Sequence, residues 1–166
     1  MKLTPLAWVV LTTVLVIAAI IMVSLVITEN LHPAYETAVE FVNAAGRGDD
    51  ATAFALLSSA MQNYVTEHCP DGSVSACVAG YTPEDWGNLT TAVYRRSISD
   101  GPAWDVLLLA GYEEGEGFAG VCIYNRVEEV LPDVWRVSAW SGFVSCAGSN
   151  AGLSGLRRDD APNRAP

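Results

Sequence analysis

An uninterrupted apolar run near the start of the chain constrains its structure more than any other feature. Pro5 to Ile27 spans 23 residues without a charged side chain, and its only polar side chains are Thr12, Thr13 and Ser24. As an α-helix rising 1.5 Å per residue, the run would measure about 34 Å. That length is enough to cross a hydrocarbon core of roughly 30 Å. We therefore predict a transmembrane anchor over this run.

The alternative to an anchor is a signal peptide that is cleaved after export. The apolar core of a signal peptide usually runs about 7–15 residues, which is shorter than this segment. Val26, Ile27 and Thr28 match a small-x-small cleavage pattern poorly, and no cysteine lies nearby to form a lipoprotein signal. These features favour a retained signal-anchor, and they leave cleavage of the segment open.

The charges that flank the run predict its orientation. Lys2 is the only basic residue before it, and the first charged residue after it is Glu29. Because loops rich in Lys and Arg tend to stay on the cytoplasmic side, residues 1–4 are expected in the cytoplasm and residues 28–166 outside it. The predicted location is the cell membrane, crossed once, with the C-terminal part extracytoplasmic.

The extracytoplasmic part is strongly acidic. Beyond Ile27 the chain carries 8 Arg and 19 Asp and Glu, so its formal net charge is 8 − 19 = −11. Such a domain is repelled by nucleic-acid phosphates and by anionic lipid headgroups, so nucleic acid is excluded as a partner.

All four cysteines lie beyond the anchor, where an even number indicates disulfides rather than a metal site. Their spacing lacks the paired CxxC or Cys/His pattern of zinc sites, so no metal and no cofactor are expected. Of the three possible pairings, Cys69–Cys77 and Cys122–Cys146 are favoured, since the first would close a short loop and the second would join late strands. Free buried thiols are the alternative.

The segment that follows the connector 28–32 is helical in its pattern. Pro33 to Ala45 repeats apolar residues at helical spacing, and Gly46 to Gly48 ends that helix. Asp49 or Asp50 is placed to cap a second helix over Ala51 to Glu67, and capping is the preferred interpretation of this carboxylate pair.

The pattern changes to that of β-strands after a short helical start signal at Thr82 to Asp85. Four segments rich in Val, Ile, Tyr, Trp and Thr are separated by Gly or Pro turns, over residues 89–99, 103–112, 118–130 and 134–145. In a regular final hairpin, Cys122 would face position 142 instead of Cys146. The preferred pairing therefore requires a bulge, which Ser141-Gly142 could provide.

The predicted fold class is α+β. Two to three helices pack on a curved antiparallel sheet of about four strands, forming a cone-shaped domain over residues 33–146. Residues 147–166 are rich in Ala, Gly, Ser, Asn, Asp, Arg and Pro, so we expect a disordered tail there.

A family resemblance rests on the two helices. Ala38 to Ala45 (Ala-Val-Glu-Phe-Val-Asn-Ala-Ala), Gly48-Asp49 and Ala53 to Ser58 (Ala-Phe-Ala-Leu-Leu-Ser) resemble the opening of the nuclear-transport-factor-like superfamily. This superfamily includes ketosteroid isomerase and has a cystatin-like α+β cone. The resemblance implies a pocket between sheet and helices. No stretch of the chain matches the catalytic motifs of the enzymes of the superfamily, so no catalytic residue is assigned.

The candidate ligand-binding residues are Arg96, Trp104, Trp140 and His68. Arg95 and Arg96 point to opposite faces of an extended strand, so one of them would enter the pocket. There we expect it to pair with an acid such as Asp105, or to bind an anion. The tryptophans would line the core and the pocket. His68 would continue the apolar stripe of the second helix at its C-terminal end.

Three functions follow as hypotheses. The leading one is a non-enzymatic, membrane-tethered interaction or scaffold domain of the cell envelope, with envelope proteins as partners. The second is a binding domain for a small hydrophobic ligand in the cone pocket. The third is an enzyme of isomerase or dehydratase type, which would need at least two titratable groups converging in that pocket.

Overall fold

The computed structural model divides the chain into two units, residues 1–31 and 32–166. The structure describes residues 13–18, 32–80, 82–114 and 121–146. Residues 13–18 are helical, and the rest of the predicted anchor and the predicted tail lie outside the described residues. Within those ranges, no helix is long and apolar enough to span a membrane.

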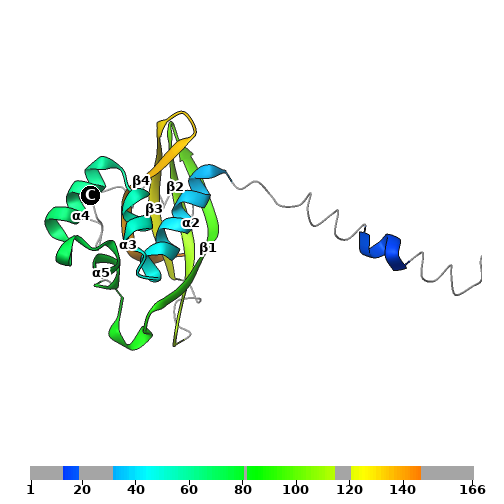
Figure 1. Cartoon of the computed structure of the whole chain (residues 1–166), viewed down its shortest axis with the longest axis horizontal. Coiled ribbons are helices and arrows are strands. Elements are labelled where there is room, and N and C mark those ends of the chain that lie inside the picture. The colour runs from blue at the N-terminus through cyan, green and yellow to red at the C-terminus, as the bar shows by residue number, and fades with distance from the viewer. Residues whose placement is uncertain (1–12, 19–31, 81, 115–120, 147–166) are drawn as a thin grey trace, which may run out of the picture. The chain divides into compact units, whose positions relative to one another are not determined.

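The second unit has the predicted α+β fold, with its helices first in the chain and its strands last (Figure 1). The helical elements are α2 (Pro33–Gly46), α3 (Asp50–Ala55), α4 (Ser59–His68), η1 (Pro70–Gly72), α5 (Val74–Ala79) and η2 (Glu84–Trp86). The strands are β1 (Leu89–Asp100), β2 (Ala103–Tyr112), β3 (Val121–Leu131) and β4 (Val134–Ser145). Asp49 accepts a hydrogen bond from the Thr52 backbone N–H, which confirms the predicted cap.

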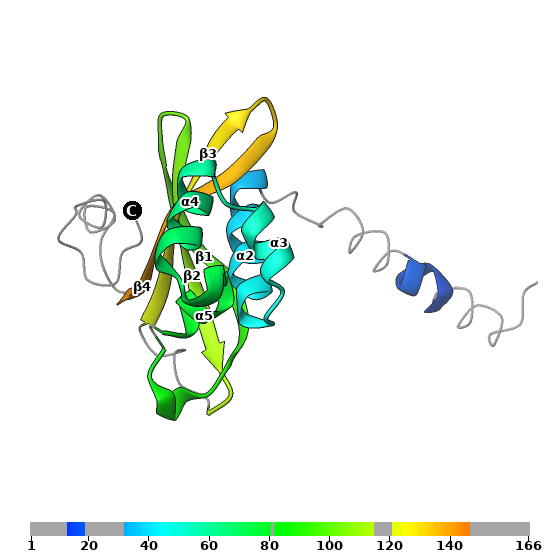
Figure 2. The same cartoon turned by 60° about the vertical axis from the view of Figure 1, so that its left-hand side comes forward.

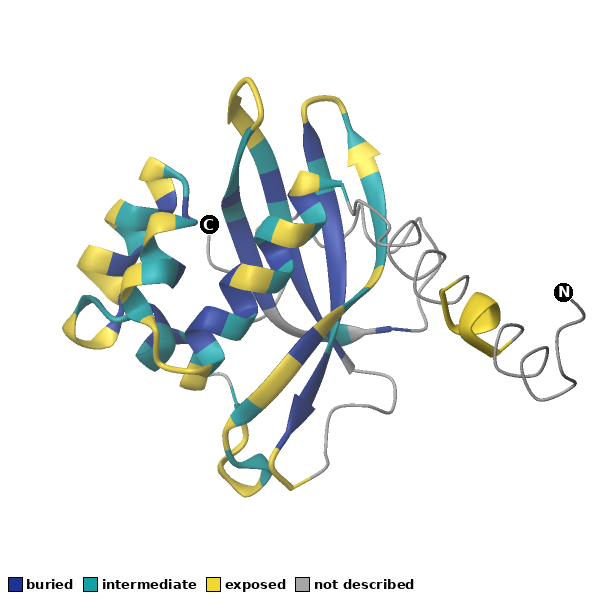
Figure 3. Ribbon diagram, turned by 45° about the vertical axis from the view of Figure 1, so that its right-hand side comes forward, coloured by how far each residue is buried: buried dark blue, intermediate teal, exposed yellow. Residues whose placement is uncertain are grey.

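The strands form one antiparallel sheet in the order β1-β2-β3-β4, each paired with its neighbour in the chain. Hairpins of this kind place the β1–β2 and β3–β4 turns at the same end of the sheet (Figure 2). The helices cover one face, and Figure 3 shows their outward surfaces exposed and the strands beneath them largely buried.

Both predicted disulfides are present, Cys69–Cys77 and Cys122–Cys146, with Cα–Cα distances of 5.1 Å and 5.2 Å. The second depends on two extra residues in β4. Ile123 pairs with Phe143 but Tyr124 pairs with Ser141, so the register shifts at the predicted bulge, and it also shifts between Arg126 and Val127, where Ser138 is the extra residue. Together the two shifts pair Cys122 with Val144, two residues before Cys146.

The second helix was predicted as a single element over 51–67, and this is wrong. It is broken into α3 and α4 because residues Leu56 to Ser58 leave the helix and lie along β4. The Leu56 carbonyl accepts from the Val137 N–H at 2.9 Å, and the Ser58 N–H donates to the Val137 carbonyl at 2.9 Å. The Ser58 hydroxyl then caps α4 by accepting from the Met61 N–H.

Two groups of buried side chains lie on the two faces of the sheet. The helix-facing group joins Phe41 and Val42 of α2 to strand residues such as Leu108 and Val127. The other group contains residues of the strands and of the second disulfide, namely Leu107, Cys122, Tyr124 and Cys146. Ile123 and Val127 of β3 thus belong to the helix-facing group, and Cys122 and Tyr124 belong to the other.

Asn43 fixes α2 to the edge of the sheet. Its side-chain amide donates to the Ala92 carbonyl at 2.9 Å and accepts from the Ala92 N–H at 2.8 Å. Ala92 lies on β1, which among the described strands pairs only with β2, so its outer backbone groups have no strand partner there. Asn43 takes the place of that missing strand.

We predict that Asn43→Ala lowers the free energy of unfolding by about 1–3 kcal/mol, because it leaves two backbone groups of a buried residue without a partner. Urea denaturation of the disulfide-bonded protein measures the change. Asn63→Ala is the matched control, since Asn63 is an exposed asparagine on α4. Equal midpoints for the two variants would contradict the proposed role of Asn43.

Candidate functional site

The four candidate binding residues do not form one site. His68 stacks on Tyr64 at 4.7 Å and so continues the stripe at the end of α4, but it is exposed there. Trp140 is only 2% exposed and contacts the rings of Phe41 and Tyr64 in the interior. Trp104 is half-buried on β2.

Arg96 does not pair with Asp105, contrary to prediction. Strand register is the reason: Arg96 lies opposite Leu107, whereas Asp105 lies opposite Arg126 on β3. The register of β1 also shifts between Tyr94 and Arg96, so that the two arginines of this strand do not simply alternate. Within the described residues, the buried Nε of Arg96 has no hydrogen-bond partner.

Arg126 is instead the centre of an ion-pair network. Its guanidinium donates to Asp105 at 3.0 Å, to Asp100 at 3.0 Å and to Glu128 at 3.1 Å. The Tyr124 hydroxyl donates to the same Asp105 oxygen at 2.7 Å. The fully buried Asp105 thus receives two donors, as a buried carboxylate requires.

The charges of this network indicate that it stabilises the fold and does not act as a binding or catalytic site. Partial burial alone would lower the pKa of Arg126, but Asp100, Asp105 and Glu128 outweigh burial and raise it. The guanidinium therefore stays charged and uses all three of its nitrogens on its own carboxylates. A permanently charged, internally paired arginine is poorly suited to proton transfer or to binding an external anion.

A cluster of rings lies where the chain enters the domain. This entry cluster consists of His32, Tyr35, Tyr94, Trp104 and Trp135. The His32 ring lies 4.9 Å from each of the two tryptophan rings, and Tyr35 stacks on Tyr94 at 4.8 Å. All five side chains are half-buried, so the cluster is both a packing unit and part of the surface.

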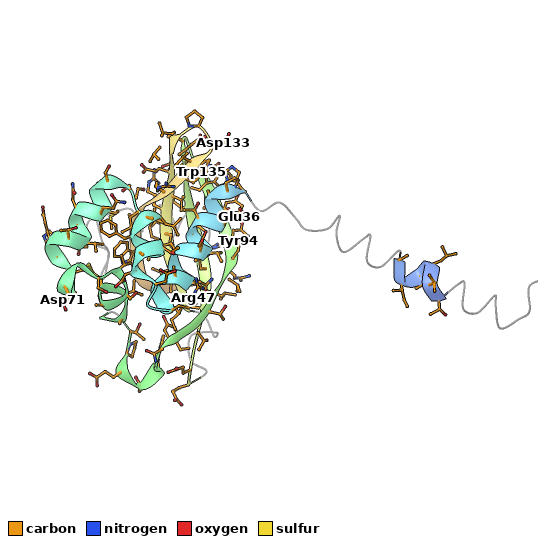
Figure 4. The ribbon with its side chains drawn as sticks, in the orientation of Figure 1. Glu36, Arg47, Asp71, Tyr94, Asp133 and Trp135 are labelled. Carbon is orange, nitrogen blue, oxygen red and sulfur yellow. A yellow bond between two sulfur atoms is a disulfide. The ribbon has the colours of Figure 1, made fainter. Side chains whose placement is uncertain are left out.

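The β3–β4 turn extends beyond the entry cluster. Trp135 pairs with Glu129 across this hairpin, and Leu131 pairs with Val134 at its tip. Val130 is 47% exposed and Leu131 is 64% exposed. Figure 4 shows Asp133 and Trp135 at the same end of the domain as Glu36 in the first turn of α2.

A groove of about 960 Å³ lies at the other end of α2. Its walls come from the end of α2, from α5, from the segment around η2 and from the ends of β1 and β2. Most of its lining side chains are small or polar, and its charged members are Arg47, Glu84 and Glu113. The groove contains none of the four residues selected from the sequence.

Glu113 fixes one wall of this groove. Its carboxylate accepts from the Asn88 backbone N–H at 2.9 Å and from the Asn88 side-chain amide at 3.1 Å. These two hydrogen bonds lower the pKa of Glu113, and the bond from the Asn88 backbone N–H has the larger effect. Gly87 has a φ of 69°, and an added Cβ there would lie 2.8 Å from the carboxylate. Glycine at this position therefore allows the close approach.

We predict that Glu113→Gln weakens the loss of stability in acid. Because the pKa of Glu113 is lower in the folded chain than its ordinary value near 4.5, its charge stabilises the fold above that pH. This contribution disappears as the pH falls through the folded-state pKa. The substituted side-chain amide keeps an acceptor oxygen but does not titrate.

Urea midpoints at pH 7 and pH 3 test this prediction. The fall in urea midpoint from pH 7 to pH 3 should be smaller for Glu113→Gln than for the wild type. Glu67→Gln, at an exposed glutamate of α4, is the matched control. Identical pH dependence in Glu113→Gln and the wild type would contradict the role assigned to Glu113.

The interior beneath α2 holds two polar groups without partners. Asn125 is fully buried, and neither its amide nitrogen nor its amide oxygen has a hydrogen-bond partner among the described residues. The same holds for the indole N–H of Trp140, which lies opposite Asn125 in the β3–β4 register. No group of three His, Cys, Asp or Glu in the described part of the chain could hold a metal ion.

Two of these features were missed by sequence reasoning. The entry cluster joins residues from several elements, and its only sequence signal is that Trp104 and Trp135 each follow a predicted turn. The Arg126 network depends on which residue of β3 lies opposite Asp105, and no local pattern specifies that. Comparison with family models, curated proteins and solved structures found no match for this chain.

Proposed function

We propose that this protein is a membrane-tethered, extracytoplasmic, non-enzymatic interaction domain of the cell envelope. The observation that carries the proposal is the pair of disulfides in the domain that follows a 23-residue run without charge. Disulfides persist in oxidising compartments and are rare in the cytosol. A domain with two of them, joined to a membrane-length apolar segment, is suited to work at the outer side of that membrane.

The described chemistry supports an interaction role over the two alternatives. Arg126, Asp105 and Tyr124 are bonded to one another, so they offer no free acid and base. The interior beneath α2 is filled by large rings, including Phe41 and Trp140. These features support binding at the surface more than binding of a small hydrophobic ligand in a cone pocket or an isomerase-type reaction.

The groove is the proposed binding surface. It is concave and is lined partly by small side chains such as Ala76 and Ala79, so a partner could approach its backbone closely. It also lies at the opposite end of the 14-residue α2 from the entry cluster, about 20 Å away along the helix. In a tethered domain this end is free to face a partner.

We also propose that the domain belongs to the nuclear-transport-factor-like superfamily, and the order of its elements supports this. Helices precede an antiparallel meander of four strands and cover one of its faces. Asp49, part of the Gly-Asp break in the motif, caps α3. The motif residues are thus used for packing and turns, which supports a shared fold and assigns no chemistry.

We predict that the full-length protein stays with membranes after extraction with alkaline carbonate, while a variant without residues 5–27 is soluble. A 23-residue apolar helix buries enough surface to make membrane insertion effectively irreversible. Protease added to sealed spheroplasts should digest the domain and leave the N-terminus protected. A full-length protein that carbonate removes would contradict the anchor.

We predict that affinity purification of the full-length protein in mild detergent recovers defined envelope proteins. Ala79→Arg should weaken their binding about tenfold, a loss of ~1.4 kcal/mol of binding free energy, and so lower their recovery. Arginine would occupy the groove with a long charged side chain. Ala60→Arg is the control, because Ala60 is also an exposed helical alanine and lies outside the groove. Equal recovery with both variants would remove the groove as the binding surface.

A further inference from the structure

The exposed aliphatic side chains of the domain are concentrated at one hairpin tip. Among the described residues of the second unit, the large hydrophobic side chains that are exposed are Val93, Val130 and Leu131. Two of these three are consecutive, and the exposed Pro132 follows them. Leu131 is the most exposed of the three, at 64%. These adjacent apolar residues at the end of β3 leave much of their surface exposed within the fold, which points to an external contact.

This tip lies at the end of the domain where the chain enters from the predicted anchor. His32, the first residue of the unit, contacts Trp135, and Trp135 is one residue from Val134, the partner of Leu131. Figure 2 shows the β3–β4 turn and the first turn of α2 at the same end. The entry point therefore contacts the same hairpin that carries the tip, a few residues from it along β4.

The covalent chain limits how far this end can lie from a membrane. The predicted anchor ends at Ile27, and five peptide steps connect it to His32. Five extended residues reach at most about 18 Å. Under the proposed tether, this length of chain keeps the entry cluster near the surface of the membrane that holds the anchor. The hairpin tip shares that position.

We propose that the β3–β4 tip rests in the interfacial layer of the membrane that holds the anchor, with Val130, Leu131 and Pro132 inserted shallowly. This inference rests on the proposed tether. The half-buried rings of Trp104, Trp135 and the neighbouring tyrosines then lie at headgroup level, where aromatic side chains with one polar end are favoured. The tether supplies a high effective concentration, so a small apolar contact is sufficient.

The charges beside the tip set the depth and the lipid preference. Glu129 and Asp133 flank the apolar residues, and the Glu129 carboxylate accepts from the Asp133 N–H at 2.9 Å. Carboxylates are costly in hydrocarbon, so they hold the tip at the level of the headgroups. They are also repelled by anionic lipids, so the contact is strongest on a zwitterionic surface and weakens as anionic lipid is added.

The test uses the full-length protein in vesicles of zwitterionic phosphatidylcholine, with a fluorophore sensitive to polarity attached at Val130→Cys. The described cysteines are all in disulfides, so the introduced thiol is the one that reacts. Val93→Cys is the matched control. Val93 is 46% exposed against 47% for Val130, but it lies on β1, seven residues before the end of that strand. Lipids carrying a nitroxide near the headgroup report contact by quenching.

We expect the label at position 130 to shift its emission to shorter wavelength and to be quenched, and the label at position 93 to remain water-like. Leu131→Asp in the Val130→Cys protein should abolish the quenching, and phosphatidylglycerol should reduce it. Water-like emission at position 130 in vesicles from which carbonate cannot extract the protein would overturn the inference while leaving the tether intact. A shift seen only in native membranes would also overturn it, because a protein would then cover the tip.

Discussion

The attachment of α2 to the sheet decides where the other parts of the domain lie. Its apolar side, including Phe41 and Val42, is buried against the strands, and Asn43 binds both backbone groups of Ala92 on the edge strand. Burial of the apolar side supplies most of the favourable free energy, but it is non-directional. The two hydrogen bonds of Asn43 fix the position of the helix along β1, and with it the ends of the domain.

The two ends of α2 differ in chemistry. At its start, His32 packs between Trp104 and Trp135, beside a hairpin whose tip exposes apolar side chains. At its end, the chain borders a groove with small and charged lining residues, among them Arg47 and Glu113. This difference is the basis for proposing a membrane contact at the first end and a protein-binding surface at the second. This arrangement fits a domain that presents a partner site away from the membrane.

Each edge strand of the sheet is hydrogen-bonded at one residue to a segment outside the sheet. Asn43 occupies the outer backbone groups of Ala92 on β1, and residues 56–58 pair with Val137 on β4. Unpaired edges are templates for association with other strands, so these bonds remove part of each edge from such pairing. The break between α3 and α4 is a direct consequence, because the chain has to leave the helix to make these bonds.

Patterns in the chain were enough to predict that helices precede strands, the strand limits to within a few residues, and a helix cap at Asp49 or Asp50, and the cysteine positions favoured both disulfides. These features depend on periodicity, turn residues and spacing, which can be read directly from the sequence. Three features needed the folded chain: Asp105 pairs with Arg126 instead of Arg96, the second helix is split, and five rings meet at the entry point. Each of these depends on strand register or on contacts between distant segments, and a shift of one residue in register changes which side chains meet.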